Sequence, residues 1–181
     1  MTIAKLKPFL AYAGIPAICG VLLLIRAGSV DAFTLMKLEA LAIAGYIAAA
    51  VDLKEKRIPN KLVLAMLAAW IIMMTPKLFF DTDIAIKTLI DAALGLAVGG
   101  GLFFLTYLIS RKGLGGGDVK FMAAAGIYLG FGRTVSVMLA GTMLAGMTGL
   151  TLLLLKKIGR KDTIPLAPFL YIGILITLFF Q

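Results

Sequence analysis

The sequence predicts an all-α, polytopic membrane protein: a transmembrane helical bundle of about seven spans (six to seven) with its N-terminus in the cytoplasm. Three observations predict this fold class. Hydrophobic residues make up 61% of the 181 residues, the mean hydropathy is +1.04, and charged residues make up only 15%. A water-soluble domain of this size needs more polar surface than such a composition supplies. We therefore expect a single membrane-embedded domain over residues 1–181.

The expected spans follow from the length of helix that crosses a bilayer, which is about 20 apolar residues. In chain order the apolar runs are Pro8 to Ile25, Phe33 to Val51, Leu62 to Phe80, Ile84 to Ile109, Val119 to Gly132, Thr134 to Leu155 and Ile164 to Phe180. The first run could be mistaken for a secretion signal, but no clear small-residue cleavage site precedes the next run. We interpret residues 1–31 as an extra N-terminal anchor helix and residues 32–181 as the core.

The distribution of lysine and arginine predicts the orientation of the bundle, because short cytoplasmic loops carry an excess of both residues. With the N-terminus inside, most of the 18 lysines and arginines fall on the cytoplasmic side. The exceptions are Arg26, Lys37, Lys77, Lys87 and Arg133. The net charge of +9 therefore indicates topology and not binding to nucleic acid. We expect a multi-pass protein of the cytoplasmic (inner) membrane, in contact with the lipid bilayer.

Residues that bind metals are scarce in this sequence. It contains no histidine, and its single cysteine, Cys19, lies within the first expected span. An intramolecular disulfide and a Cys-x-x-Cys metal site are therefore impossible, and the commonest metal ligand and general base is missing. We expect no metal and no cofactor, so catalysis would use carboxylates, lysines or hydroxyls.

Two polar segments interrupt the apolar chain, and each carries one aspartate at the end of an expected span. Asp52 begins the segment that runs to Asn60, and Asp118 lies in the segment from Gly115 to Lys120. On the charge-derived topology both aspartates reach the cytoplasmic side at similar depth. Two carboxyl groups that meet in a membrane bundle can form the catalytic pair of an aspartic peptidase.

Each aspartate also has a structural alternative. Asp118 follows three glycines and precedes an apolar helix, which is typical of a helix N-cap. Asp52 could be a solvated interfacial acid that pairs with Lys54 or Lys56. The C-terminal end of a helix is an electrostatically poor place for an acid, however, and this favours a functional role for Asp52.

Other residues are expected to shape the bundle. Pro59 holds Ile58 extended, and Asn60 is expected to cap the third helix. Asp91 lies inside the fourth span, where a charge is costly, so we expect it to bond a partner helix. Small residues at helical spacing predict close helix packing. They are Gly95, Gly99, Gly126, Gly130, Gly141, Ala145 and Gly149.

The run from Val119 to Gly132 is short for a membrane span. Its 14 residues would cover about 21 Å, whereas the hydrocarbon core is about 30 Å thick. If Gly132 and Arg133 mark its outer end, Asp118 is recessed below the cytoplasmic membrane surface. The irregular glycine-rich backbone before Asp118 would then need a covering protein segment or a water-filled notch.

At these segments the chain resembles the type IV prepilin peptidases, membrane aspartic proteases of the Gly-x-Gly-Asp class. The first catalytic motif of that family is similar to Asp52, Lys54, Arg57, Ile58, Pro59 and Asn60. The second is similar to Gly115, Gly117, Asp118 and Lys120. A proline-containing segment near the last helix is similar to the stretch with Pro165 and Pro168, although Leu166-Ala167 stands where the family usually has Phe-Gly.

The resemblance implies an aspartic endopeptidase in which Asp52 and Asp118 activate water to cut the short basic leader from a pilin-like precursor at the cytoplasmic membrane face. Larger bacterial members carry a cytoplasmic domain, often with paired Cys-x-x-Cys motifs, that is associated with methylation. This sequence has no such motif, so the resemblance implies a short, peptidase-only form without methyltransferase activity. A small proton- or cation-coupled transporter or channel that uses Asp52, Asp91 and Asp118 is the alternative, and a scaffold subunit is the third.

Overall fold

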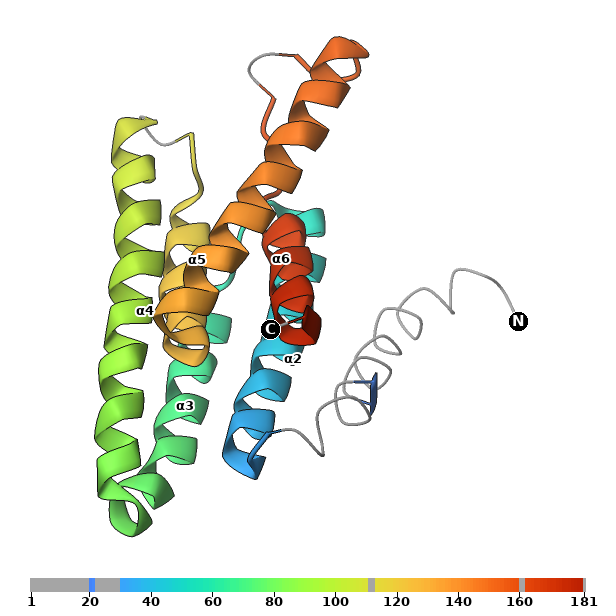
Figure 1. Cartoon of the computed structure of the whole chain (residues 1–181). Helices are drawn as coiled ribbons and strands as arrows, with labels where there is room; N and C mark the ends of the chain where they lie inside the picture. The colour runs from blue at the N-terminus through green and yellow to red at the C-terminus, as the bar shows by residue number, and fades with distance from the viewer. Residues whose placement is uncertain (1–19, 22–29, 111–112, 160–161, 181) are drawn as a thin grey trace.

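The computed structural model describes residues 20–21, 30–110, 113–159 and 162–180, which form helices and connecting loops without strands (Figure 1). The helices are α2 (Ala32–Glu55), α3 (Asn60–Phe80), α4 (Thr82–Ile109), α5 (Gly116–Leu154) and α6 (Ala167–Phe180). The first four are long and apolar enough to cross a membrane, and α6 is a shorter apolar helix. The all-α, multi-pass character is therefore confirmed. The count of seven spans, the cytoplasmic N-terminus and the single domain stay predictions, and the span expected from Pro8 to Ile25 lies outside the described residues except for Gly20 and Val21.

Helix α5 combines the two runs that the sequence separates into a fifth and a sixth span. The helical backbone is interrupted at Gly130, whose φ of 75° and ψ of −177° are accessible to glycine but not to residues with a side chain. Figure 1 shows the first half of α5 running back along α4 and the second half turning away in the opposite direction. Asp91 of α4 lies at this break, where its Oδ1 accepts the Phe131 N–H at 2.9 Å. The expectation that Asp91 bonds a partner helix is confirmed.

The break in α5 lies inside the bundle, and not at an outer end marked by Gly132 and Arg133. Asp91 is the tenth residue of α4, so the break lies about 13 Å along that helix. The first half of α5, residues 116–129, is about 21 Å long. This half-helix therefore turns back before it reaches the far end of α4.

Close backbone contact between α4 and α5 determines where the first half of α5 lies along the axis of α4. A Cβ atom on Gly95 would overlap the Gly126 carbonyl, and one on Gly99 would lie 2.5 Å from the Met122 carbonyl oxygen. The expectation of close packing at Gly95, Gly99 and Gly126 is thus confirmed. Continued along the two antiparallel helices, this pairing brings Asp118 level with Phe103, about 9 Å before the end of α4.

Helix α6 lies between α2 and the second half of α5. Its Leu170 packs on Gly141 of α5, and the Tyr171 ring lies edge-on to Tyr46 of α2, with 6.0 Å between ring centroids. The first turn of α6 consequently comes beside the last turn of α2, which carries Asp52.

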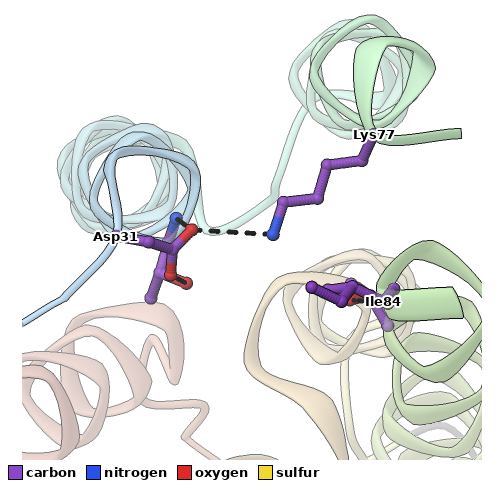
Figure 2. A network of polar contacts seen from close by, with 5 residues as sticks. Asp31, Lys77 and Ile84 are labelled. Atoms are coloured by element: carbon purple, nitrogen blue, oxygen red, sulfur yellow. Dashed lines mark hydrogen bonds and ion pairs between the residues drawn. The ribbon is translucent and has the colours of Figure 1, made fainter. Parts of the chain in front are cut away.

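The opposite end of α2 is fixed by Asp31, which caps the helix (Figure 2). Its carboxylate accepts the Thr34 N–H at 3.2 Å and the Thr34 hydroxyl at 2.6 Å. The hydroxyl bond is the main cause that lowers the pKa of Asp31. Lys77 of α3 lies 3.6 Å from the same carboxylate, and its ammonium is 4.2 Å from the centre of the Phe33 ring. These contacts join α2 and α3 at the end of the bundle away from Asp52.

Replacing Gly130 by alanine should destabilise the protein strongly. The new Cβ would require an unfavourable positive φ and would overlap the Asp91 carboxylate, and the backbone cost alone is about 1–3 kcal/mol. Gly101→Ala is the matched control, because Gly101 lies inside α4 with nothing within 4 Å of a Cβ atom. Thermal unfolding in detergent should show a lower midpoint for Gly130→Ala and an unchanged or higher midpoint for Gly101→Ala. Equal midpoints would contradict the assigned backbone break.

Candidate active site

A cavity of about 160 Å³ lies among the last turn of α2, the start of α5 and the segment that leads into α6. Both Asp52 and Asp118 line it. The remaining lining residues are Lys56, Gly113, Gly115, Thr163, Ile164, Pro165 and Leu166. The structure therefore brings together the two aspartates that the sequence places on different helices.

Asp52 is fixed in this cavity by the backbone of α6. Its residue surface is only 4% exposed, and its Oδ2 accepts the N–H of Ala167 at 3.0 Å. The Ala167 N–H belongs to the first turn of α6, where helical N–H groups have no partner within the helix. A solvated acid paired with Lys54 or Lys56 is therefore the wrong description of Asp52, because a buried contact with α6 holds it.

Asp118 points into the same cavity from the first turn of α5. It is 8% exposed, and its Oδ1 is buried without a hydrogen-bond partner among the described residues. The N-cap of α5 is Gly115, with no capping bond from a side chain, so Asp118 is not the N-cap residue, although its carboxylate lies beside the Gly115 backbone. A buried carboxyl oxygen that lacks a partner is costly in a fold and is typical of a functional group.

Two glycines of the second motif have little free space beside them. A Cβ on Gly115 would lie 2.6 Å from Oδ2 of Asp118, and one on Gly117 would lie 3.1 Å from the backbone nitrogen of Ile58. Ile58 is buried, and Pro59 forms the N-cap of α3. The two motifs thus pack directly on each other, with Ile58 against the glycine-rich turn before Asp118.

A polar contact joins the two motifs as well. The ammonium of Lys120 donates to Oδ1 of Asn60 at 3.0 Å. Asn60 is the first residue of α3 and not its cap, which corrects the expectation from the sequence. Its side-chain oxygen binds Lys120 instead of a backbone N–H of its own helix.

Other sequence-predicted residues do not line the cavity. Lys54 is exposed, and Arg57 is an exposed partner of Glu55 at 3.4 Å. Pro168 lies in the first turn of α6 outside the cavity lining, whereas Pro165 is part of it. Lys56, which the sequence suggested only as a solvated partner of Asp52, lines the cavity, and no local pattern separates it from the neighbouring lysines.

The cavity offers carboxylates, backbone groups and one lysine for chemistry. Within the described ranges, no cluster of three or more histidine, cysteine, aspartate or glutamate residues could hold a metal ion. Two carboxyls that share a cavity can hold a single proton between them, and such a pair can act as a base toward water and as an acid toward a carbonyl group.

Fold and cavity together define a multi-pass membrane protein in which two buried aspartates line one cavity near the helix ends. The chain belongs to the type IV leader peptidase family, whose model matches residues 39–150. The matched region contains both Asp52 and Asp118 and ends before the segment with Pro165.

Relatives in three bacteria are each named prepilin leader peptidase/N-methyltransferase. The Legionella pneumophila protein is 31% identical over 129 residues, which cover 71% of this chain and 44% of the relative. The Aeromonas hydrophila protein is 29% identical over 128 residues, covering 68% and 42%, and the Escherichia coli K12 protein is 28% identical over 136 residues, covering 71% and 56%. The chain thus spans about half the length of these relatives. No solved structure gives a significant match.

The bond between Lys120 and Asn60 predicts a measurable coupling between the two motifs. Lys120→Met and Asn60→Ala should each lower the thermal midpoint slightly, because an exposed charged hydrogen bond contributes about 0.2–1 kcal/mol. In a double-mutant cycle the second substitution should add little once the first is present. Fully additive effects would show that the two side chains do not interact.

Proposed function

We propose that the protein is a membrane aspartic endopeptidase that removes the short basic leader from type IV pilin-like precursors at the cytoplasmic membrane face. The observation that carries the proposal is the shared cavity of Asp52 and Asp118, two buried carboxyls on different helices. Family membership and the printed names of the relatives support the same activity. The proposal covers peptide cleavage alone, because the carboxyl pair offers chemistry for that reaction.

The mechanism follows from the cost of placing two negative charges in one buried site, because this cost keeps one of the two carboxyl groups protonated. One carboxyl of the pair stays ionised and takes a proton from a water molecule, whose oxygen attacks the carbon of the scissile carbonyl. The other carboxyl is protonated and donates to the carbonyl oxygen. The protons then pass to the departing amine, so the peptide bond is replaced by a carboxylate and an amine.

The charge distribution supports cytoplasmic cleavage. The cavity lies at the end of the bundle where the last turn of α2 and the connection to α3 carry Lys54, Lys56 and Arg57. The second half of α5 leads to Lys156 and Lys157 at this end as well. Lys37 and Lys77 belong to the opposite end. An excess of basic residues on the cavity side favours a cytoplasmic location, which is where the leader of such a precursor would remain.

A transporter or channel receives less support from the geometry. Asp91 would belong to its ion path, but its Oδ1 accepts the Phe131 N–H at the break in α5. Asp91 is also absent from the residues that line the cavity of Asp52 and Asp118. Its role in the described part of the bundle is to satisfy a backbone group.

Substitution of the three aspartates distinguishes these functions. In liposomes containing a pilin-like precursor, Asp52→Asn and Asp118→Asn should each reduce cleavage by at least about a thousandfold, because either change removes one half of the acid–base pair. Asp91→Asn should retain cleavage, since the amide oxygen can still accept the Phe131 N–H. A shift in precursor mass measures cleavage, and thermal unfolding verifies that each variant is folded. Retained cleavage in either catalytic variant would exclude the proposed pair.

A further inference from the structure

Lys56 has a backbone conformation that is unusual for lysine. Its φ of 51° and ψ of 38° lie in the left-handed region, and its N–H donates to the Asp52 carbonyl oxygen at the end of α2 at 2.9 Å. Glycine or asparagine usually ends a helix in this way, because a β-carbon is disfavoured there. A lysine where glycine would fit better points to a role for its side chain.

The Lys56 side chain connects α2 to the segment that precedes α6. Its ammonium donates to the Thr163 carbonyl at 3.2 Å. The other end of this segment is bound as well, because the Ala167 N–H donates to Oδ2 of Asp52. Residues 163–166 are therefore attached at both ends to groups from the last turn of α2.

Residues 163–166 form one wall of the cavity that holds Asp52 and Asp118. The volume of this cavity is about 160 Å³. Binding sites for small molecules are usually about 300–1,000 Å³, and this smaller cavity is partly open to its surroundings. A peptide that reaches the two aspartates would therefore lie against the 163–166 segment.

We propose that Lys56 is a positioning residue of this peptidase: its ammonium holds the 163–166 segment over the aspartates, closing the cavity around the scissile bond. This inference rests on the proposed function. Closure excludes bulk water and orients the peptide toward the carboxyl pair. Lys56 acts through the segment, and it touches neither the attacking water nor the scissile bond.

Lys156 provides a matched control. It too has a left-handed backbone, with a φ of 54°, and it follows the end of α5 on the same side of the bundle. Within the part of the chain that the structure describes, its side chain makes no hydrogen bond, and Lys156 does not line the cavity. Replacement of either lysine by glycine relieves the same backbone conformation, but only Lys56→Gly removes a contact with residues 163–166.

The first experiment measures cleavage kinetics in liposomes. Lys56→Gly should lower kcat about three- to fivefold, the effect expected for an exposed charged hydrogen bond, with KM changed less than about twofold. Its thermal midpoint should not fall, because glycine suits the backbone. Lys56→Arg should keep the kcat of the unsubstituted protein, because arginine can still donate to the Thr163 carbonyl. Lys156→Gly should also leave kcat unchanged. A fall in thermal midpoint that parallels the loss of kcat, or an equal loss in Lys156→Gly, would overturn the proposal.

The second experiment does not depend on cleavage. Ile164→Cys in a full chain with Cys19→Ser places one thiol on the cavity wall, and a water-soluble maleimide reports its accessibility. Adding Lys56→Gly should raise the labelling rate about three- to fivefold, and adding Lys156→Gly should not. An unchanged rate would overturn the role of Lys56. A raised rate in a protein that cleaves no precursor would refute the peptidase function and leave the contact with the segment intact.

Discussion

The close contact between α4 and the first half of α5 is the constraint on which the geometry of the cavity depends. At Gly95 and Gly126 the two backbones touch without an intervening side chain. Lipid offers no hydrophobic drive for helix association, so backbone contact and van der Waals packing must hold these helices together. Asp118 lies eight residues before Gly126 on the same half-helix, about 12 Å away, and any separation of the helices would move this carboxyl relative to Asp52.

The break at Gly130 completes this arrangement. A helix that is broken inside a membrane leaves C=O groups without partners before the break and N–H groups without partners after it, and each such group is costly in hydrocarbon. Asp91 accepts one of them from Phe131, and the hydroxyl of Thr134 donates to the Gly130 carbonyl. The short half-helix that carries Asp118 is therefore possible because polar side chains satisfy the backbone where it turns back.

The sequence was sufficient to predict the all-α membrane class and to place Asp52 and Asp118 at the same end of the bundle, because both follow from composition and charge. It could not predict the role of Asn60, since helix-cap statistics describe a local preference and Lys120, which binds Asn60, lies 60 residues away. The Lys56 contact with Thr163 spans 107 residues and depends on a backbone conformation that propensity assigns to glycine. Contacts of this kind arise from tertiary packing and have no local pattern.

The segment before α6 differs in sequence from the segment that it resembles, yet it still contacts Asp52. Leu166-Ala167 replaces the Phe-Gly that resembling proteins usually have, yet the contact with Asp52 uses the N–H of Ala167. Any residue except proline supplies that donor. The fully buried Ala167 side chain limits the volume at this position, and the position of α6 directs the N–H toward Asp52. The contact with Asp52 therefore depends less on which side chains lie between Pro165 and Pro168 than on the packing of α6 between α2 and α5. This packing places the Ala167 N–H next to the carboxylate.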